Sequence, residues 1–97
     1  MSYRITKYTR DQAKKLGVTI KASNTSGKKI DVFKNGVKVA SVGAIGYNDY
    51  PTFMRLEKEG KVPKGTANTR RKAYKQRHEK DRHIRGSAGY YADKLLW

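Results

Sequence analysis

Residues 28–43, KKIDVFKNGVKVASVG, carry the clearest local signal for the fold. Two alternating runs rich in β-branched residues are separated by Asn35-Gly36, the dipeptide that favours a two-residue type I′ turn. The segment therefore predicts a β-hairpin. The predicted cross-strand pairs are Lys34 with Val37, Val32 with Val39, and Ile30 with Ser41. In that register one face carries Ile30, Val32, Val37 and Val39, and the other carries Phe33, Ala40 and Val42.

The segments before the hairpin predict a short helix and a third strand. Residues 9–17, TRDQAKKLG, suit a helix that Thr9 or Asp11 caps and that ends at Gly17. Residues 18–22, VTIKA, have the β-branched composition of a strand.

After the hairpin, a helix is expected to begin at Asp49 or Tyr50 and to end at Gly60. Pro51 would lie in its first turn, where a missing N–H costs nothing. The aromatic residues nearby have two interpretations. They could stack on bases, as aromatic side chains do in single-strand binders. In so small a protein we favour the interpretation that they belong to the core; these residues are Tyr47, Tyr50 and Phe53.

The last third of the chain predicts two helices. Residues 66–84 form the longest expected helix, with Gly86 as its terminator. Ser87 is placed to cap a final short helix that ends in the apolar sequence Leu95-Leu96-Trp97. An apolar end is costly to expose, so it either folds back onto the core or docks on another copy or another protein. Folding back is the simpler expectation.

Together these elements predict an α+β fold. We expect a small antiparallel β-sheet centred on residues 18–43, with its central Asn-Gly hairpin packed against two or three helices. Ninety-seven residues allow a single small basic domain, 1–97. Within it, residues 1–15 would be a mobile basic arm or a short helix, residues 16–60 the hairpin and a helix, and residues 66–97 the basic helix and the apolar helix.

The formal net charge of +15 is the strongest compositional feature. Residues 1–48 and 61–86 each carry +8, residues 49–60 carry −1, and residues 87–97 are neutral. Such a density of like charge opposes a compact state, and a polyanionic partner relieves that repulsion. DNA and RNA are the leading partners, because each neutralised phosphate releases condensed counterions. An anionic membrane surface or an acidic protein would also suit this charge.

The sequence gives weaker indications of location. It has no cysteine, which excludes disulfides and thiolate zinc sites and fits a reducing compartment. Its first residues lack an apolar signal segment, and no stretch approaches the roughly 20 apolar residues of a membrane span. We expect a protein of the host-cell interior, cytoplasm or nucleus, or of a virion, and not a secreted one.

Residues 69–86, TRRKAYKQRHEKDRHIRG, form the main candidate binding segment. Basic residues surround nearly the whole predicted helix, whereas an ordinary solvated helix mixes acids with bases. The chemistry indicated is phosphate contact, and DNA is favoured over RNA as the partner. The candidate nucleic-acid-binding residues are Arg70, Arg71, Lys72, Lys75, Arg77, Lys80, Arg82, Arg85, Lys28 and Lys29.

The histidines and acids of the same segment suggest two alternatives to phosphate binding, a metal site and a nuclease active site. His78 and His83 are five residues apart, so on a helix they point in different directions and cannot share one ion. Glu79 and Asp81 also point to different faces, which disfavours the paired groups that phosphodiester cleavage needs. No metal ligand, cofactor or catalytic residue is therefore assigned, and we do not expect an enzyme.

Longer motifs support a resemblance to a known family over residues 15–97. The motifs are GKKIDV at 27–32, GYNDYPT at 46–52, RRKAYKQRH at 70–78 and GSAGYYADKLLW at 86–97. These resemble small basic proteins encoded by large double-stranded DNA viruses of algae and amoebae. The resemblance implies a viral context and no particular chemistry.

Two functions are therefore expected. The leading one is non-enzymatic binding of nucleic acid, viral DNA above all, without strong sequence specificity. The alternative is a small virion or capsid-associated protein. That protein would use its basic face for assembly, and would contact other virion proteins or itself through Leu95, Leu96 and Trp97.

Overall fold

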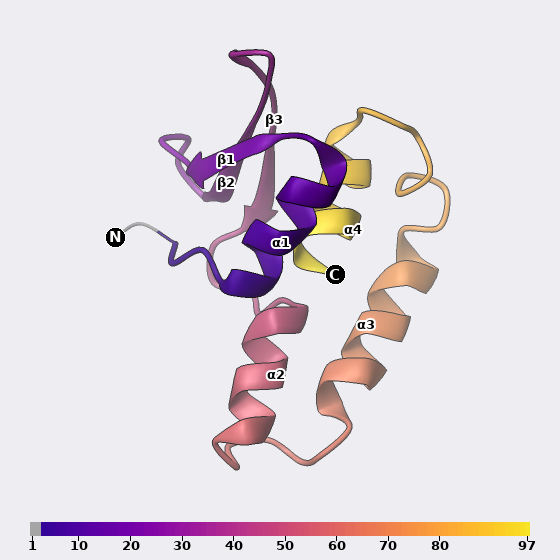
Figure 1. The fold of residues 1–97 in the computed structure, drawn as a ribbon. Coiled ribbons are helices and arrows are strands. Elements are labelled where there is room, and N and C mark those ends of the chain that lie inside the picture. Colours follow the sequence, from indigo (N-terminus) through magenta and orange to yellow (C-terminus); the bar gives the residue numbers. More distant parts are fainter. Residues whose placement is uncertain (1–2) are drawn as a thin grey trace.

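A computed structural model describes residues 3–97 and confirms the α+β class (Figure 1). The sheet is antiparallel, in the order β1-β2-β3. The elements are α1 (Lys7–Leu16), β1 (Thr19–Ala22), β2 (Lys28–Lys34), β3 (Val37–Ala44), α2 (Tyr50–Lys58), α3 (Thr66–Arg77) and α4 (Ala88–Leu96). Of the expected arm at residues 1–15, the first two residues lie outside the described part, and residues 7–15 belong to α1.

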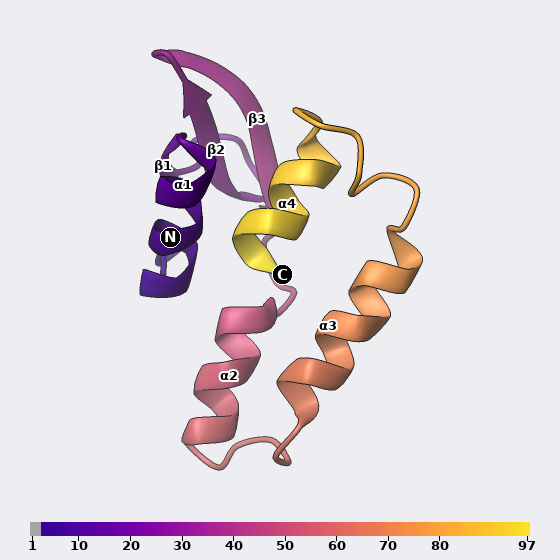
Figure 2. The same cartoon turned by 45° about the vertical axis from the view of Figure 1, so that its right-hand side comes forward.

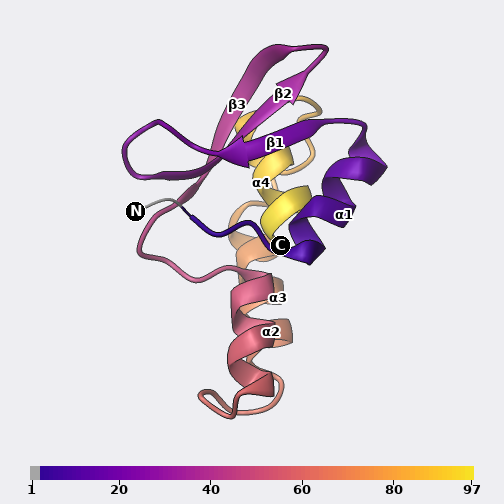
Figure 3. The same ribbon diagram turned by 60° about the vertical axis from the view of Figure 1, so that its left-hand side comes forward.

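The molecule has two parts that differ in packing. Helices α1 and α4 cover the same face of the sheet, where the core lies (Figure 2). Helices α2 and α3 form an antiparallel pair that extends away from the sheet (Figures 1 and 3). Two helices thus pack on the sheet, as expected. The fully or nearly fully buried apolar residues of this core are Ala13, Ile30, Val32, Val42, Tyr91, Leu95 and Leu96.

The hairpin has the predicted turn but not the predicted register. Asn35 and Gly36 both have positive φ, as a type I′ turn requires, and Lys34 pairs with Val37. A β-bulge then shifts the pairing, so that Val32 lies opposite Ala40 instead of Val39. The shift turns Val42 into the core, whereas Val37 and Val39 are exposed. The predicted face was wrong because one extra residue in a strand reverses the side of every residue beyond it.

Short-range capping signals were predicted well. Asp49 caps α2 by accepting a hydrogen bond from the Thr52 amide, and Pro51 lies in the first turn. Ser87 caps α4 by accepting from the Tyr90 amide. Helix α1 ends at the left-handed Gly17 as expected, but its cap is Thr6 and not Thr9 or Asp11.

The expected long helix at 66–84 was too long. Helix α3 ends at Arg77, and residues 78–86 form turns. The Asp81 and Arg82 amides donate to the His78 carbonyl, and a Cβ added at Gly89 would lie 3.0 Å from the Cβ of Asp81. The turns therefore pack against α4 and reverse the chain toward the sheet. A longer α3 would also be weakened by repulsion between basic side chains at i and i+4. The packing of the turns against α4 is therefore favoured over a longer helix.

The apolar C-terminus folds back onto the core, which was the simpler of the two expectations. Leu95 and Leu96 are completely or almost completely buried, and Trp97 is half-buried. Gly43 allows this approach, because a Cβ at that position would lie 2.8 Å from Leu96 Cδ1. Self-association through Leu95 and Leu96 would therefore require them to leave the core.

Candidate nucleic-acid interface

All eight acidic side chains have partners within the chain. Three of them, Asp31, Asp49 and Asp93, are buried. Four others lie within ion-pair distance of a basic side chain: Asp11, Glu59, Glu79 and Asp81. The last, Glu57, accepts a 2.6 Å hydrogen bond from the Ala67 amide at the start of α3. Each acid is thus near a group of the protein that can interact with it, three of them in the interior and the others at or near the surface.

Asp49 is the centre of one buried polar cluster. Lys29 Nζ lies 3.0 Å from its Oδ2, and the Tyr3 hydroxyl donates to the same oxygen at 2.7 Å. Burial alone raises the pKa of Asp49, but hydrogen bonds from Thr52, Tyr3 and Lys29 outweigh it and hold that pKa below its usual value. Lys29 Nζ also donates to the Tyr47 carbonyl. The cluster joins the sheet to the start of α2.

A second buried carboxylate is that of Asp31 on β2. It accepts hydrogen bonds from the hydroxyls of Ser23 and Ser41, at 2.6 and 2.7 Å. Burial again raises its pKa, and the hydrogen bonds from Ser23, Ser41 and the Asn24 amide outweigh that effect and lower it. This carboxylate ties the β1–β2 turn to β3.

Asp93 on α4 anchors the inner face of α3. Its side chain is 1% exposed, and Lys75 Nζ donates to it at 2.7 Å. Arg82, in the turns after α3, lies 3.8 Å from the other oxygen. On the same side of α3, the Arg71 guanidinium lies over the ring of Tyr50, 4.6 Å from its centre. These three cations hold α3 against α4 and α2.

Most basic side chains have no such partner. Eight of the 23 Lys and Arg form ion pairs within residues 3–97, which leaves fifteen without one. The fifteen are Arg4, Arg10, Lys14, Lys15, Lys21, Lys28, Lys34, Lys58, Lys64, Arg70, Arg71, Lys72, Arg77, Lys80 and Arg85. Their charge is balanced only by solvent ions, which a polyanion can replace.

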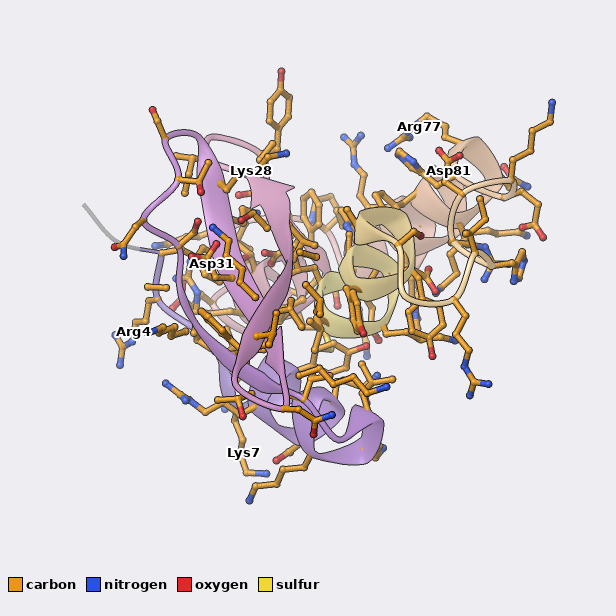
Figure 4. The ribbon with its side chains drawn as sticks, turned by 90° about the horizontal axis from the view of Figure 1, so that it is seen from above. Arg4, Lys7, Lys28, Asp31, Arg77 and Asp81 are labelled. Atoms are coloured by element: carbon orange, nitrogen blue, oxygen red, sulfur yellow. The ribbon has the colours of Figure 1, made fainter. Side chains whose placement is uncertain are left out.

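One face of α3 alternates cations with aromatic rings. Arg70, Tyr74, Arg77 and His78 follow the i, i+4, i+7, i+8 spacing of a single helix face. Arg70 and Arg77 are exposed, and His78 and Tyr74 are half-buried. Figure 4 shows Arg77 on α3 and Lys28 on β2 at the same side of the molecule, away from Lys7 of α1. We call Arg70, Arg77 and Lys28 the groove cations.

These cations line an open groove of about 640 Å³ between the sheet and the α2–α3 pair. Lys28, Gly43 and Ala44 form part of the sheet side, and Phe53 and the α3 face form the opposite side. Leu96 and Trp97 of the C-terminus also line it. The folded-back tail therefore forms part of the groove wall.

Three aromatic rings form a column along this groove. Tyr74 stacks on Trp97 with ring centres 4.4 Å apart and planes 7° apart. His78 stacks on the other side of Tyr74 at 4.3 Å. Tyr47 also lines the groove, from the loop before α2, and is 76% exposed. A groove with cations and accessible ring faces has the features of sites that bind unpaired nucleotides.

The ten predicted binding residues fall into groups. Lys28, Arg70 and Arg77 line the groove. Lys72 and Lys80 are exposed outside it, and Arg85 is exposed beside Tyr90, Tyr91 and Lys34 in a separate hollow. The residues with structural partners are Lys29, Arg71, Lys75 and Arg82. Lys29 is 5% exposed, so the structure removes it from the surface cations.

The aromatic residues of the groove were not all predicted. Tyr47 was expected in the core, and that interpretation is wrong, because the side chain projects from a loop and is mostly exposed. Tyr50 and Phe53 are half-buried and contact Arg71 and Arg70 instead of the hairpin. The position of Tyr47 between Gly46 and a helix cap was the signal for a loop.

The histidines lie apart, each near an acid. His83 Nε2 lies 2.7 Å from Glu79, and His78 Nδ1 lies 3.9 Å from Asp81. Within residues 3–97 no group of three or more His, Asp or Glu side chains is arranged to hold a metal ion. No helix in the same residues is long and apolar enough to cross a membrane.

The fold and the groove define a small basic α+β domain with a cation-lined, partly aromatic groove. Comparisons with protein-family models, with curated proteins and with solved structures give no match to this chain.

Proposed function

We propose that this protein is a non-enzymatic nucleic-acid-binding protein that contacts phosphates without strong sequence specificity. The observation that carries the proposal is the division of charge. Every acid has a partner within the fold, and three of the eight are buried, while fifteen Lys and Arg have no ion-pair partner in residues 3–97. A nucleic acid would meet a surface that has cations available and few free carboxylates to repel it.

The groove cations are the centre of the proposed interface. Arg70 and Arg77 present planar guanidinium groups from one helix face, and Lys28 faces them from the sheet. Arginine suits phosphate because its fork of donors can contact two oxygens at once. Phosphate contacts carry no sequence information, and we assign no residue to reading base edges.

The resemblance to virus-encoded proteins supports DNA as the partner. If the chain belongs to that family, the nucleic acid is the viral genome, and the protein acts inside the host cell or the virion. The alternative role in virion assembly used the C-terminal tail as an anchor. Because Leu95 and Leu96 are in the core, that role would depend on the basic face and on Trp97.

The proposal is tested by measuring duplex DNA binding of the double variant Arg70→Ala/Arg77→Ala at low salt. We expect roughly tenfold weaker binding or more, and a plot of log K against log salt that is shallower by about 2, because two phosphate contacts are lost. Fluorescence anisotropy with a labelled duplex gives both quantities.

The matched control is Arg10→Ala/Lys14→Ala on α1. Both residues are exposed and have no ion pair in residues 3–97, so this variant loses the same charge away from the groove. We expect it to bind more tightly than the groove variant does. Equal weakening by the two variants would mean that net charge alone governs binding, and no binding by the wild type would refute the proposal.

A further inference from the structure

The groove continues beyond the part already described. A second hollow of about 450 Å³ shares Lys28, Gly43, Tyr74, His78 and Ala92 with the first. It extends along the turns after α3 to Ile84, Ser87 and Gly89. The two hollows therefore adjoin at these residues, and we call them together the channel. Two adjoining open hollows suit an extended chain better than a compact small molecule.

Accessible apolar and aromatic groups occur along this channel. Tyr47, which lines the first hollow, is 76% exposed, and Ile84, which lines the second, is 58% exposed. The column of Trp97, Tyr74 and His78 ends at His78, whose side chain is 39% exposed. Flat rings at this exposure are platforms on which further rings can stack.

The cations lie where a backbone beside such stacked rings would pass. Arg70 precedes Tyr74 by one turn on α3, and Arg77 adjoins His78. Lys28 lines both hollows from the opposite wall. The one exposed carboxylate of the channel, Asp81, lies 3.9 Å from His78 Nδ1. Rings and cations therefore alternate in the way that bases and phosphates alternate along a strand.

We propose that this channel binds an unpaired nucleic-acid strand, with bases stacked on Tyr47 and His78 and phosphates at Arg70, Arg77 and Lys28. The inference depends on the proposed function and specifies its substrate. In a duplex the bases are already stacked on each other inside the helix, so their faces cannot reach the rings. Only an unpaired strand gains both stacking and ion pairing here.

The test compares the affinities of oligo-dT and of a blunt duplex of the same length at the same salt, by anisotropy. We expect oligo-dT to bind more tightly. We expect Tyr47→Ala to weaken oligo-dT binding roughly fivefold to tenfold, the lower part of the range for loss of one base stack. The same variant should leave duplex binding unchanged. Tyr47 is exposed, so its removal spares the core.

Two further measurements locate the strand. Tyr47→Phe keeps the ring and should bind oligo-dT like the wild type. Trp97 is the only tryptophan of the chain and lines the groove, so its fluorescence should change more with oligo-dT than with duplex at equal saturation.

The outcomes separate this inference from the broader proposal. Equal affinity for both nucleic acids, with no effect of Tyr47→Ala on either, overturns the single-strand site and leaves phosphate binding standing. Absence of binding to both at low salt overturns the two proposals together.

Discussion

At the scale of single residues, the buried carboxylates decide which cations remain at the surface. Asp49 is 1% exposed, and its ion pair with Lys29 is almost completely buried from solvent. Breaking such a pair is costly because the surviving charge stays in a poorly solvated site. Lys29 and Lys28 are neighbours in sequence and yet have different roles, one internal and one in the groove.

Asp49→Ala should lower the free energy of unfolding by about 3–5 kcal/mol, because Lys29 is left buried without its counter-ion. The variant also loses the cap of α2. Urea unfolding followed by circular dichroism measures the change. Asp11→Ala is the control, since Asp11 pairs with Lys7 at the surface and its loss should alter stability little. Equal effects of the two variants would contradict the importance of the buried cluster.

The pKa values of Asp49 and Asp31 predict loss of stability in acid. Both are lower in the folded protein than the usual value near 4, so their contribution is complete above about pH 4. It is lost as the pH falls through the folded pKa values, because the unfolded chain then binds more protons. Urea unfolding at pH 7 and pH 3 should show this. Asp31→Asn should show a weaker dependence on pH between these values, and an unchanged dependence would contradict the assignment.

At the scale of elements, α3 has one face that packs inside the protein and one face that lines the groove. Lys75 and Arg71 face α4 and α2, whereas Arg70 and Arg77 face the groove. The sequence shows bases around the whole helix and does not distinguish these faces. The distinction depends on Asp93, which is 16 residues beyond Arg77 and reaches α3 only through the reversal of the chain.

Lys75→Ala should therefore affect mainly the stability of the protein, and Arg77→Ala mainly its binding of DNA. Lys75→Ala should destabilise the protein by about 1–3 kcal/mol, because it leaves the buried Asp93 with only the more distant Arg82 and Lys94. Arg77→Ala should change stability by less than about 0.5 kcal/mol and weaken DNA binding. Thermal unfolding and anisotropy on the same samples measure both. If Lys75→Ala stayed folded and lost as much DNA affinity as Arg77→Ala, the division of α3 into a structural and a binding face would be contradicted.

The elements show what the sequence could and could not predict. The caps at Asp49 and Ser87 and the turn at Asn35-Gly36 were predictable, because residues within three positions determine them. The bulge between Val32 and Phe33 was not predicted. The end of α3 was not predictable either, because the turns after it pack against α4, which is distant in sequence. The groove was unpredictable for the same reason, although the residues of its α3 face were all within the basic segment.

At the scale of the whole molecule, the structure combines a small core with a large excess of positive charge. The core is formed by the sheet, α1 and α4, and the α2–α3 pair extends from it (Figure 2). The cations of both parts meet at the groove, where residues of the sheet, α3 and the C-terminus lie together. A charge of +15 is unfavourable for an isolated compact chain and is relieved when phosphates bind.

The salt dependence of nucleic-acid binding tests this account most directly. With the three groove cations engaged, the slope of log K against log salt should be about −3 or steeper. Between about 50 and 200 mM salt the affinity of the wild type should then fall roughly 60-fold. Absence of binding at the lower salt concentration, or an affinity independent of salt, would contradict the claim that this protein binds nucleic acid through its phosphates.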